Sequence, residues 1–155
     1  LGAMMRGVEC EDTGKGAQSV PSVPRQPEES AALWESVIPI DPLAPFIYDG
    51  CTNIHFPIHT SVQFAHQVGL PGIIHQGTAT LAVAVHNILN QETGGDPQRL
   101  TAVYCRFSGM VLPDSAIRVR LTGKHQVSGR TDLFFTVLNA EEKRAISDGY
   151  IRLQD

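Results

Sequence analysis

The sequence lacks long apolar runs and clusters of basic residues. No apolar stretch approaches the roughly 20 residues that a membrane-spanning helix needs, so we expect no such helix. The chain carries 12 Lys and Arg residues against 16 Asp and Glu residues, which gives a formal net charge of -4. Because no basic cluster is present, we expect neither nucleic acid nor a membrane surface as a partner.

Cysteine is also scarce, and its spacing fits neither a disulfide framework nor a zinc site. We therefore predict that Cys10, Cys51 and Cys105 are free thiols in a reducing compartment, which favours a cytoplasmic protein. Cys105 falls in a predicted strand and is expected to be a small residue of the core.

Large apolar side chains are nearly absent from the N-terminal segment, and this sets the expected domain boundary. Residues 1–4 have the character of a cloning remnant, and residues 6–30 are rich in Gly, Ser, Pro, Gln and Glu. Such a composition buries too little apolar surface to offset the entropy of ordering. We predict a tag remnant and flexible arm over residues 1–33, and a single folded domain over residues 34–155.

One long helix is predicted over residues 77–92. Leu81, Val85 and Ile88 fall on one of its faces, while small residues occupy the others. Gly94 and the glycine after it end the helix. A helix this apolar is expected to be covered by the rest of the domain.

Two features are predicted upstream of that helix. Thr60 and Gln63 form a capping-box pattern, with Thr60 at the cap, which predicts a short helix over residues 60–68. Before it, two prolines are expected to keep residues 42–48 extended.

Only strand signals follow the long helix. Four segments rich in β-branched and aromatic residues are separated by turn residues, namely residues 100–107, 116–127, 133–139 and 144–153. Apolar residues alternate with arginines at residues 117–121, which indicates one buried strand face. A further short strand at residues 37–40 contains Pro39 and is expected at a sheet edge. The pattern predicts an α+β fold in which a curved antiparallel sheet wraps around one central helix.

The residues suited to chemistry gather just before the long helix. His59 is held by Pro57 in front of the predicted short helix, and imidazole titrates near neutral pH. Gly77 opens the long helix, whose N-terminal N–H groups and dipole suit a developing oxyanion. A histidine beside an oxyanion site is what proton transfer next to a thioester carbonyl requires.

Residues 53–60, 69–72 and 75–80 together carry a family resemblance, and residues 106–113 extend it. They resemble the active-site half of the MaoC-like acyl dehydratases, also called (R)-specific enoyl-CoA hydratases. The resemblance implies the hot-dog fold and a hydratase or dehydratase that acts on an enoyl-CoA or a similar thioester. It implies no cofactor, with coenzyme A present only as part of the substrate.

The family signature consists of an Asp, then Asn-Pro, an apolar residue and His. His59 and the two residues before it match the end of this signature, and Gly77 matches the glycine whose N–H binds the thioester oxygen. Phe56 stands in place of the family Asn, and the Asp is missing, with Asn53 as its nearest counterpart. The resemblance therefore implies catalytic roles for His59 and Asn53, although an amide can only hold a water or orient His59.

Three more residues could support this site. His55 or Asp49 could supply the second base, whereas His75 is expected to be structural and to bond a carbonyl near the helix start. A metal bound by His55 and His59 is not expected, because Pro57 prevents the helical spacing that such a pair needs.

Two other functions are compatible with the pattern. A hot-dog thioesterase usually carries an acidic residue early in the central helix, and here the first carboxylate after Gly77 is Glu92. A non-catalytic acyl-binding or dimerisation domain is the stronger alternative, because the Asp is missing. In every case we expect a homodimer or a pairing with a second hot-dog unit, since one curved sheet leaves an edge strand uncovered.

Overall fold

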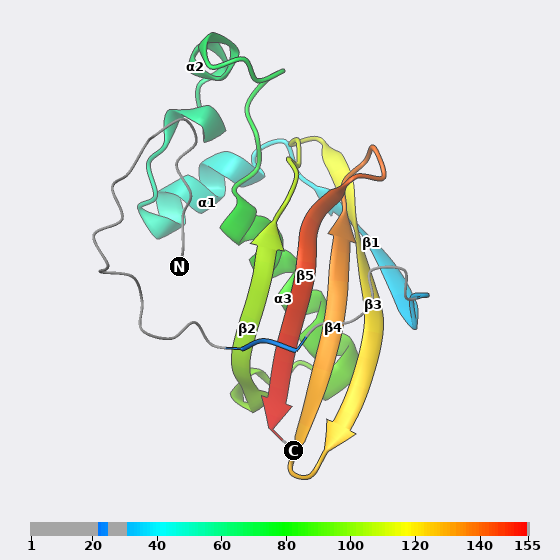
Figure 1. Cartoon of the computed structure of the whole chain (residues 1–155). Coiled ribbons are helices and arrows are strands. Elements are labelled where there is room, and N and C mark those ends of the chain that lie inside the picture. Colours follow the sequence, from blue (N-terminus) through cyan, green and yellow to red (C-terminus); the bar gives the residue numbers. More distant parts are fainter. Residues whose placement is uncertain (1–21, 25–30, 155) are drawn as a thin grey trace, which may run out of the picture.

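The computed structural model describes residues 22–24 and 31–154. These residues form a five-stranded antiparallel sheet that curves around one long helix (Figure 1). The strands are β1 (Trp34–Ile40), β2 (Leu100–Phe107), β3 (Ser115–Val127), β4 (Arg130–Leu138) and β5 (Arg144–Gln154). The helices are α1 (Ala44–Thr52), α2 (Val62–Gln67) and α3 (Gly77–Thr93), with 3-10 turns η1 (Pro57–His59) and η2 (Pro97–Arg99). Most of the predicted arm at residues 1–33 lies outside the described residues.

The strand order in the sheet is β1-β3-β4-β5-β2, so β1 and β2 are its edges. The last three strands, β3, β4 and β5, are neighbours both in sequence and in the sheet. The edge strands β1 and β2 pair with β3 and β5, which do not follow them directly in sequence. Pro39 lies in β1, which confirms the predicted edge strand. The long helix and the four later strands are also confirmed, with ends that differ by at most three residues from those predicted.

The hydrophobic core lies between α3 and the inner face of the sheet (Figure 1). Ala84, Val85 and Ile88 of α3 pack there with alternate residues of the central strands. Burying a side chain as large as that of Val85 or Ile88 contributes roughly 1.5–3 kcal/mol. On the sheet, a Cβ at Gly149 would come within 2.8 Å of the Phe135 ring, so glycine at this position lets the ring lie against the backbone of β5.

The C-terminal end of α3 is fastened to the sheet by polar contacts. Glu92 accepts a hydrogen bond from Trp34 Nε1 at 2.8 Å and forms an ion pair with Lys124 Nζ at 2.7 Å. Burial raises the pKa of Glu92, but the bonds from Lys124 and Trp34 outweigh it and lower the pKa below its ordinary value. The carboxylate therefore joins β1, α3 and β3 in its ionised form.

The predicted extended segment at residues 42–48 is wrong, because α1 begins at Ala44. Pro45 lies in the first turn of α1, where its missing N–H would have had no helical partner and its fixed φ already suits a helix. The helix ends at Asn53, which adopts the left-handed conformation with φ 56°.

The predicted cap of the short helix is also wrong by one residue. Ser61, and not Thr60, caps α2, and its hydroxyl accepts a hydrogen bond from the Phe64 N–H at 3.2 Å. Thr60 instead closes the preceding turn η1, where its N–H donates to the Pro57 carbonyl at 3.2 Å. The two segments α1 and α2 lie beyond the end of the sheet at which α3 begins (Figure 1).

Candidate functional site

The side chain of His59 is fixed by one hydrogen bond. Its Nδ1 lies 2.8 Å from the carbonyl oxygen of Ile74, and because a carbonyl can only accept, Nδ1 carries the hydrogen. The Ile74 N–H in turn donates to the Ile58 carbonyl at 3.1 Å, which ties the two segments together. The Phe56 ring meets the His59 ring edge-on at a centroid distance of 6.2 Å. This arrangement leaves Nε2 of His59 as the nitrogen that can exchange a proton.

The N-terminus of α3 has no side-chain cap. Gln76 holds the cap position, but its amide donates instead to the Pro45 carbonyl at 2.9 Å, which connects the starts of α1 and α3. Gly77 is the first residue of the helix, and a Cβ there would come within 3.1 Å of the Phe107 ring. Backbone N–H groups at such an end, together with the helix dipole, stabilise an anion.

His59 and Gly77 line a common cavity of about 270 Å³. Its walls come from η1, the start of α3, the end of β2, the loop after β2 and the start of β5. The lining consists of His59, Ile74, His75, Gly77, Thr80, Phe107, Gly109, Met110, Val111, Ala145 and Ile146. The two predicted functions, a proton-transfer group and an oxyanion site, therefore meet in one mostly apolar pocket.

His75 lines the same cavity and is 6% exposed. Neither ring nitrogen has a hydrogen-bond partner among the residues that the structure describes. The predicted bond from this ring to a carbonyl is therefore wrong. Only the backbone of His75 is anchored, through its N–H to the Val111 carbonyl at 2.8 Å. Burial lowers the pKa of His75, and the charge of His59 lowers it further.

The other three predicted site residues form a separate group, which we call the surface cluster: Asp49, His55 and Asn53. His55 Nδ1 lies 2.9 Å from Asp49 Oδ2, and His55 Nε2 lies 2.7 Å from Asn53 Oδ1. The His55 side chain is 65% exposed. None of the three lines the cavity, so the structure brings them together with one another but does not include them in the lining with His59. The catalytic role implied for Asn53 stays a prediction.

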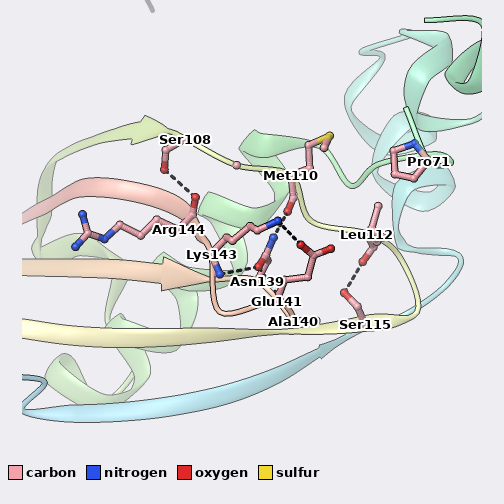
Figure 2. Close-up of a pocket in the computed structure, with 11 residues that line it drawn as sticks. Pro71, Ser108, Met110, Leu112, Ser115, Asn139, Ala140, Glu141, Lys143 and Arg144 are labelled. Atoms are coloured by element: carbon pink, nitrogen blue, oxygen red, sulfur yellow. Dashed lines mark hydrogen bonds and ion pairs between the residues drawn. The ribbon is translucent and has the colours of Figure 1, made fainter. Parts of the chain in front are cut away.

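A second cavity, of about 220 Å³, adjoins the first and shares Gly109 and Met110 with it. Its lining is more polar and includes the turn between β4 and β5 (Figure 2). In this turn Lys143 Nζ lies 2.6 Å from Glu141 Oε2, and Asn139 donates to the Met110 carbonyl at 2.8 Å. Two cations and one carboxylate in this lining, Lys143, Arg144 and Glu141, give it one net positive charge.

The described part of the chain bears on the predictions for metal ligands, cysteines and membrane-spanning helices. Within residues 22–24 and 31–154, no group of three or more His, Cys, Asp or Glu side chains is placed to hold a metal ion. Cys51 and Cys105 are free thiols, as predicted, and Cys10 lies outside the described residues. Cys105 packs beside the core, and burial raises its pKa to about 11. In the described residues, no helix combines the length and hydropathy needed to cross a membrane.

Sequence reasoning did not identify Phe107 and Met110 as lining residues. Both belong to the segment that carried the family resemblance, but the position of Phe107 against Gly77 depends on β2 lying at the sheet edge. The tether from Gln76 to α1 was missed as well, because α1 itself was not predicted. A proline in the first turn of α1 was the available signal.

Comparison with known proteins gives a family match over most of the chain. The family model described as MaoC like domain matches residues 28–144. The peroxisomal multifunctional enzyme type 2 of Drosophila melanogaster is 31% identical over 134 residues, which is 86% of this chain and 21% of that protein. The fatty acid synthase beta subunit pkiC of Emericella nidulans is 35% identical over 82 residues, 53% of this chain and 4% of that protein. The chain thus spans only a small part of the length of these relatives.

Solved structures show the same architecture. The full-length Drosophila enzyme superposes with a TM-score of 0.76 at 25% identity, covering 91% of this chain and 25% of that chain. A MaoC-like dehydratase from Phytophthora capsici superposes with a TM-score of 0.77 at 20% identity, covering 90% of this chain and 45% of that chain. The fold is therefore the hot-dog fold, as the sequence predicted.

Proposed function

This chain belongs to the MaoC-like dehydratase family, and from that membership we propose that it is a hydratase or dehydratase of acyl thioesters. Its reaction would add water to, or remove water from, the double bond of a trans-2-enoyl thioester. The observation that carries the proposal is the cavity that His59 and Gly77 line together. The name of one relative, a fatty acid synthase subunit, favours a fatty-acyl substrate.

The proposed reaction assigns separate tasks to the two residues. During hydration a base takes a proton from water as the water oxygen bonds to the β-carbon. The π electrons of the double bond then move toward the thioester oxygen, where N–H groups at Gly77 stabilise the enolate. An acid finally returns a proton to the α-carbon, which completes the addition of H and OH. Nε2 of His59 performs one of these two proton transfers, because Nδ1 is held by the Ile74 carbonyl.

We propose that the carrier end of the substrate lies along the second cavity. This cavity continues from the first at Gly109 and Met110, and it presents Lys143 beside polar groups (Figure 2). A cation there suits the phosphates of coenzyme A. The substitution Lys143→Glu should raise KM for an enoyl-CoA but not for the same acyl group on N-acetylcysteamine, which has no phosphate. An equal rise for both substrates would contradict this placement.

Pairing of two hot-dog units through β2 is part of the proposal. This edge strand exposes Val103, Tyr104 and Phe107, and Phe107 also lines the cavity. A second unit on this edge would cover the apolar side chains and close the pocket wall. Sedimentation at micromolar concentration should give a dimer, and a monomer with full hydratase activity would argue against the pairing.

The central experiment is a direct assay. The protein is incubated with short and medium trans-2-enoyl-CoA substrates, and absorbance reports the loss of the conjugated double bond. We expect turnover in the wild type and none in His59→Ala at matched folding. No turnover on any of these substrates would reject the hydratase proposal.

A non-catalytic acyl-binding domain is the second candidate, and one observation favours it: no carboxylate lines the first cavity within the described residues. It predicts that the wild type binds acyl-CoA in calorimetry without turnover. A thioesterase is less well supported, because Glu92 lies at the far end of α3 and is bonded to Trp34 and Lys124.

A further inference from the structure

We propose that Gln76 is a positioning residue, whose side-chain amide holds the N–H groups at Gly77 in place relative to His59. The inference rests on the proposed hydratase function and deepens it, since it identifies what fixes the two groups of that site with respect to each other. Gln76 lines neither cavity, so its side chain acts through the backbone that it anchors and not on the substrate.

The Gln76 side chain is buried and makes one hydrogen bond in the described protein. The residue is 2% exposed, and its Nε2 donates to the Pro45 carbonyl at 2.9 Å. Its Oε1 is buried without a partner among the described residues. An unpaired buried amide oxygen destabilises a fold, so an apolar side chain of similar size would be the less costly occupant of this position. The polarity of Gln76 is therefore explained by the bond that it donates.

Three hydrogen bonds join the segment that contains His59 to the segment that leads into Gly77. Two of them connect residues 58–59 with Ile74, at 2.8 Å and 3.1 Å. The third is the bond from Gln76 to α1, the helix that precedes η1 and His59. Only this third bond ends on the residue directly before Gly77. Gln76 also holds the cap position of α3 without capping it, so the start of α3 depends on this contact with α1.

The expected consequence for the reaction follows from where charge develops. The N–H groups at Gly77 stabilise the enolate more strongly than the neutral thioester, so their displacement should lower kcat rather than raise KM. A misplacement of about 1 Å near a reacting centre can cost roughly a hundredfold in rate. The bond from Gln76 to Pro45 is the contact that would prevent such a displacement.

The test compares Gln76→Met with the wild type and with Gln91→Met. Gln91 is a matched control at the far end of the same helix, where its Nε2 donates to Ser36 Oγ at 2.8 Å. We expect kcat on an enoyl thioester to fall roughly tenfold to a hundredfold in Gln76→Met, with KM changed little, and to stay unchanged in Gln91→Met. The thermal midpoint of Gln76→Met should change by less than about 5 °C, because loss of the bond is opposed by removal of the unpaired oxygen.

A second variant, Gln76→Glu, makes the bond dependent on pH. A protonated carboxyl group can donate to the Pro45 carbonyl, whereas an ionised one can only accept and places a negative charge near the enolate. Burial raises the pKa of such a carboxyl above its ordinary value of about 4.3. The kcat of Gln76→Glu relative to Gln76→Met should therefore be highest near pH 5 and fall as the pH rises to about 8. His59 and His75, the titratable groups of the cavity lining, are present in both variants, so their protonation cancels in this ratio.

Several outcomes would overturn the role of Gln76. They are an unchanged kcat in Gln76→Met, a rise in KM alone, an equal loss of kcat in Gln91→Met, and a kcat ratio that does not fall with pH. If Gln76→Met does not fold, the pH profile of Gln76→Glu is compared with that of the wild type, and identical profiles reject the role. Wild-type protein that turns over no enoyl thioester rejects the hydratase function as a whole, whereas an active wild type with an equally active Gln76→Met rejects only the role of Gln76.

Discussion

Two histidines in this molecule, His55 and His75, reverse the usual relation between burial and hydrogen bonding. In the surface cluster, His55 is 65% exposed, yet both of its ring nitrogens have protein partners. In the cavity, His75 is 6% exposed, yet neither of its ring nitrogens has one in the described protein. Buried polar groups are normally the better satisfied. The difference teaches that hydrogen bonds fix the exposed ring of His55 at both nitrogens, whereas no hydrogen bond within the described protein fixes the buried ring of His75.

The strongest test of this comparison is His59→Ala. Removing a group that transfers a proton in the transition state should lower the turnover of an enoyl thioester by roughly a hundredfold to ten-thousandfold. The lost bond to the Ile74 carbonyl should cost only about 1 kcal/mol of stability. Steady-state kinetics and thermal unfolding measure the two effects. Wild-type turnover in the variant would show that His59 is structural.

Gly77→Ala tests the other half of the cavity. The added Cβ would lie 3.1 Å from the Phe107 ring, so this ring must move and the cavity narrows. We expect roughly a tenfold loss of kcat/KM, since small displacements at a reacting centre are costly. Phe107→Leu in the same chain should restore part of the loss, and a double-mutant cycle measures the coupling. Additive effects of the two changes would show that the ring contact is irrelevant.

Asn53→Asp asks whether the surface cluster takes part in the reaction. If Asn53 stood in the place of the family carboxylate, the new acid would raise turnover. Because Asn53 bonds His55 and does not line the cavity, we expect turnover to change less than about threefold, which is under 1 kcal/mol in activation free energy. A large gain in rate would show that Asn53 takes part in the reaction.

The pH dependence of stability tests the lowered pKa of His75. Below its ordinary pKa of 6.5, unfolded His75 binds a proton, whereas folded His75 binds it only at lower pH. The stability of the wild type should therefore fall as the pH drops from 6.5 toward the folded pKa. In His75→Leu this contribution is absent, so the thermal midpoint should change less between pH 7 and pH 5. Identical pH profiles in variant and wild type would contradict the lowered pKa.

The smallest effect is expected for His55→Ala. Its contact with Asp49 is solvent-exposed on the histidine side, and such surface contacts contribute about 0–1 kcal/mol. The free energy of unfolding, measured by thermal denaturation, should change by no more than this amount. The turnover should stay close to that of the wild type. A severe loss of turnover would show that the surface cluster supports the reaction.

The sequence predicted those parts of the fold that local periodicity determines. Helix α3 and strand β3 could be predicted because apolar residues recur with a period of about 3.6 in a helix and 2 in a strand. Ile117 and Val119 show the strand period. The site was half predicted: His59 and Gly77 belong to one motif and do line one cavity. Helix α1 was not predicted because a proline fits an extended chain as well as a first helical turn, and Pro45 lies in the latter.

The remaining part of the site could not be predicted because it depends on distant segments. Phe107 reaches Gly77 only through the pairing of β2 with β5, which no local pattern specifies. The lack of a hydrogen-bond partner for the His75 ring likewise depends on which groups of the folded chain surround it.

The contact between Trp34 and Glu92 gives this protein an internal optical reporter. Trp34 is the single tryptophan of the chain, and its indole N–H bonds Glu92 near the C-terminal end of α3. The helix has 17 residues, so this end lies about 25 Å from Gly77. Fluorescence emission of Trp34 therefore follows detachment of β1 from the helix without responding directly to a ligand at the opposite end. Fraying of the sheet edge can in this way be timed separately from events in the cavity, in the unlabelled protein.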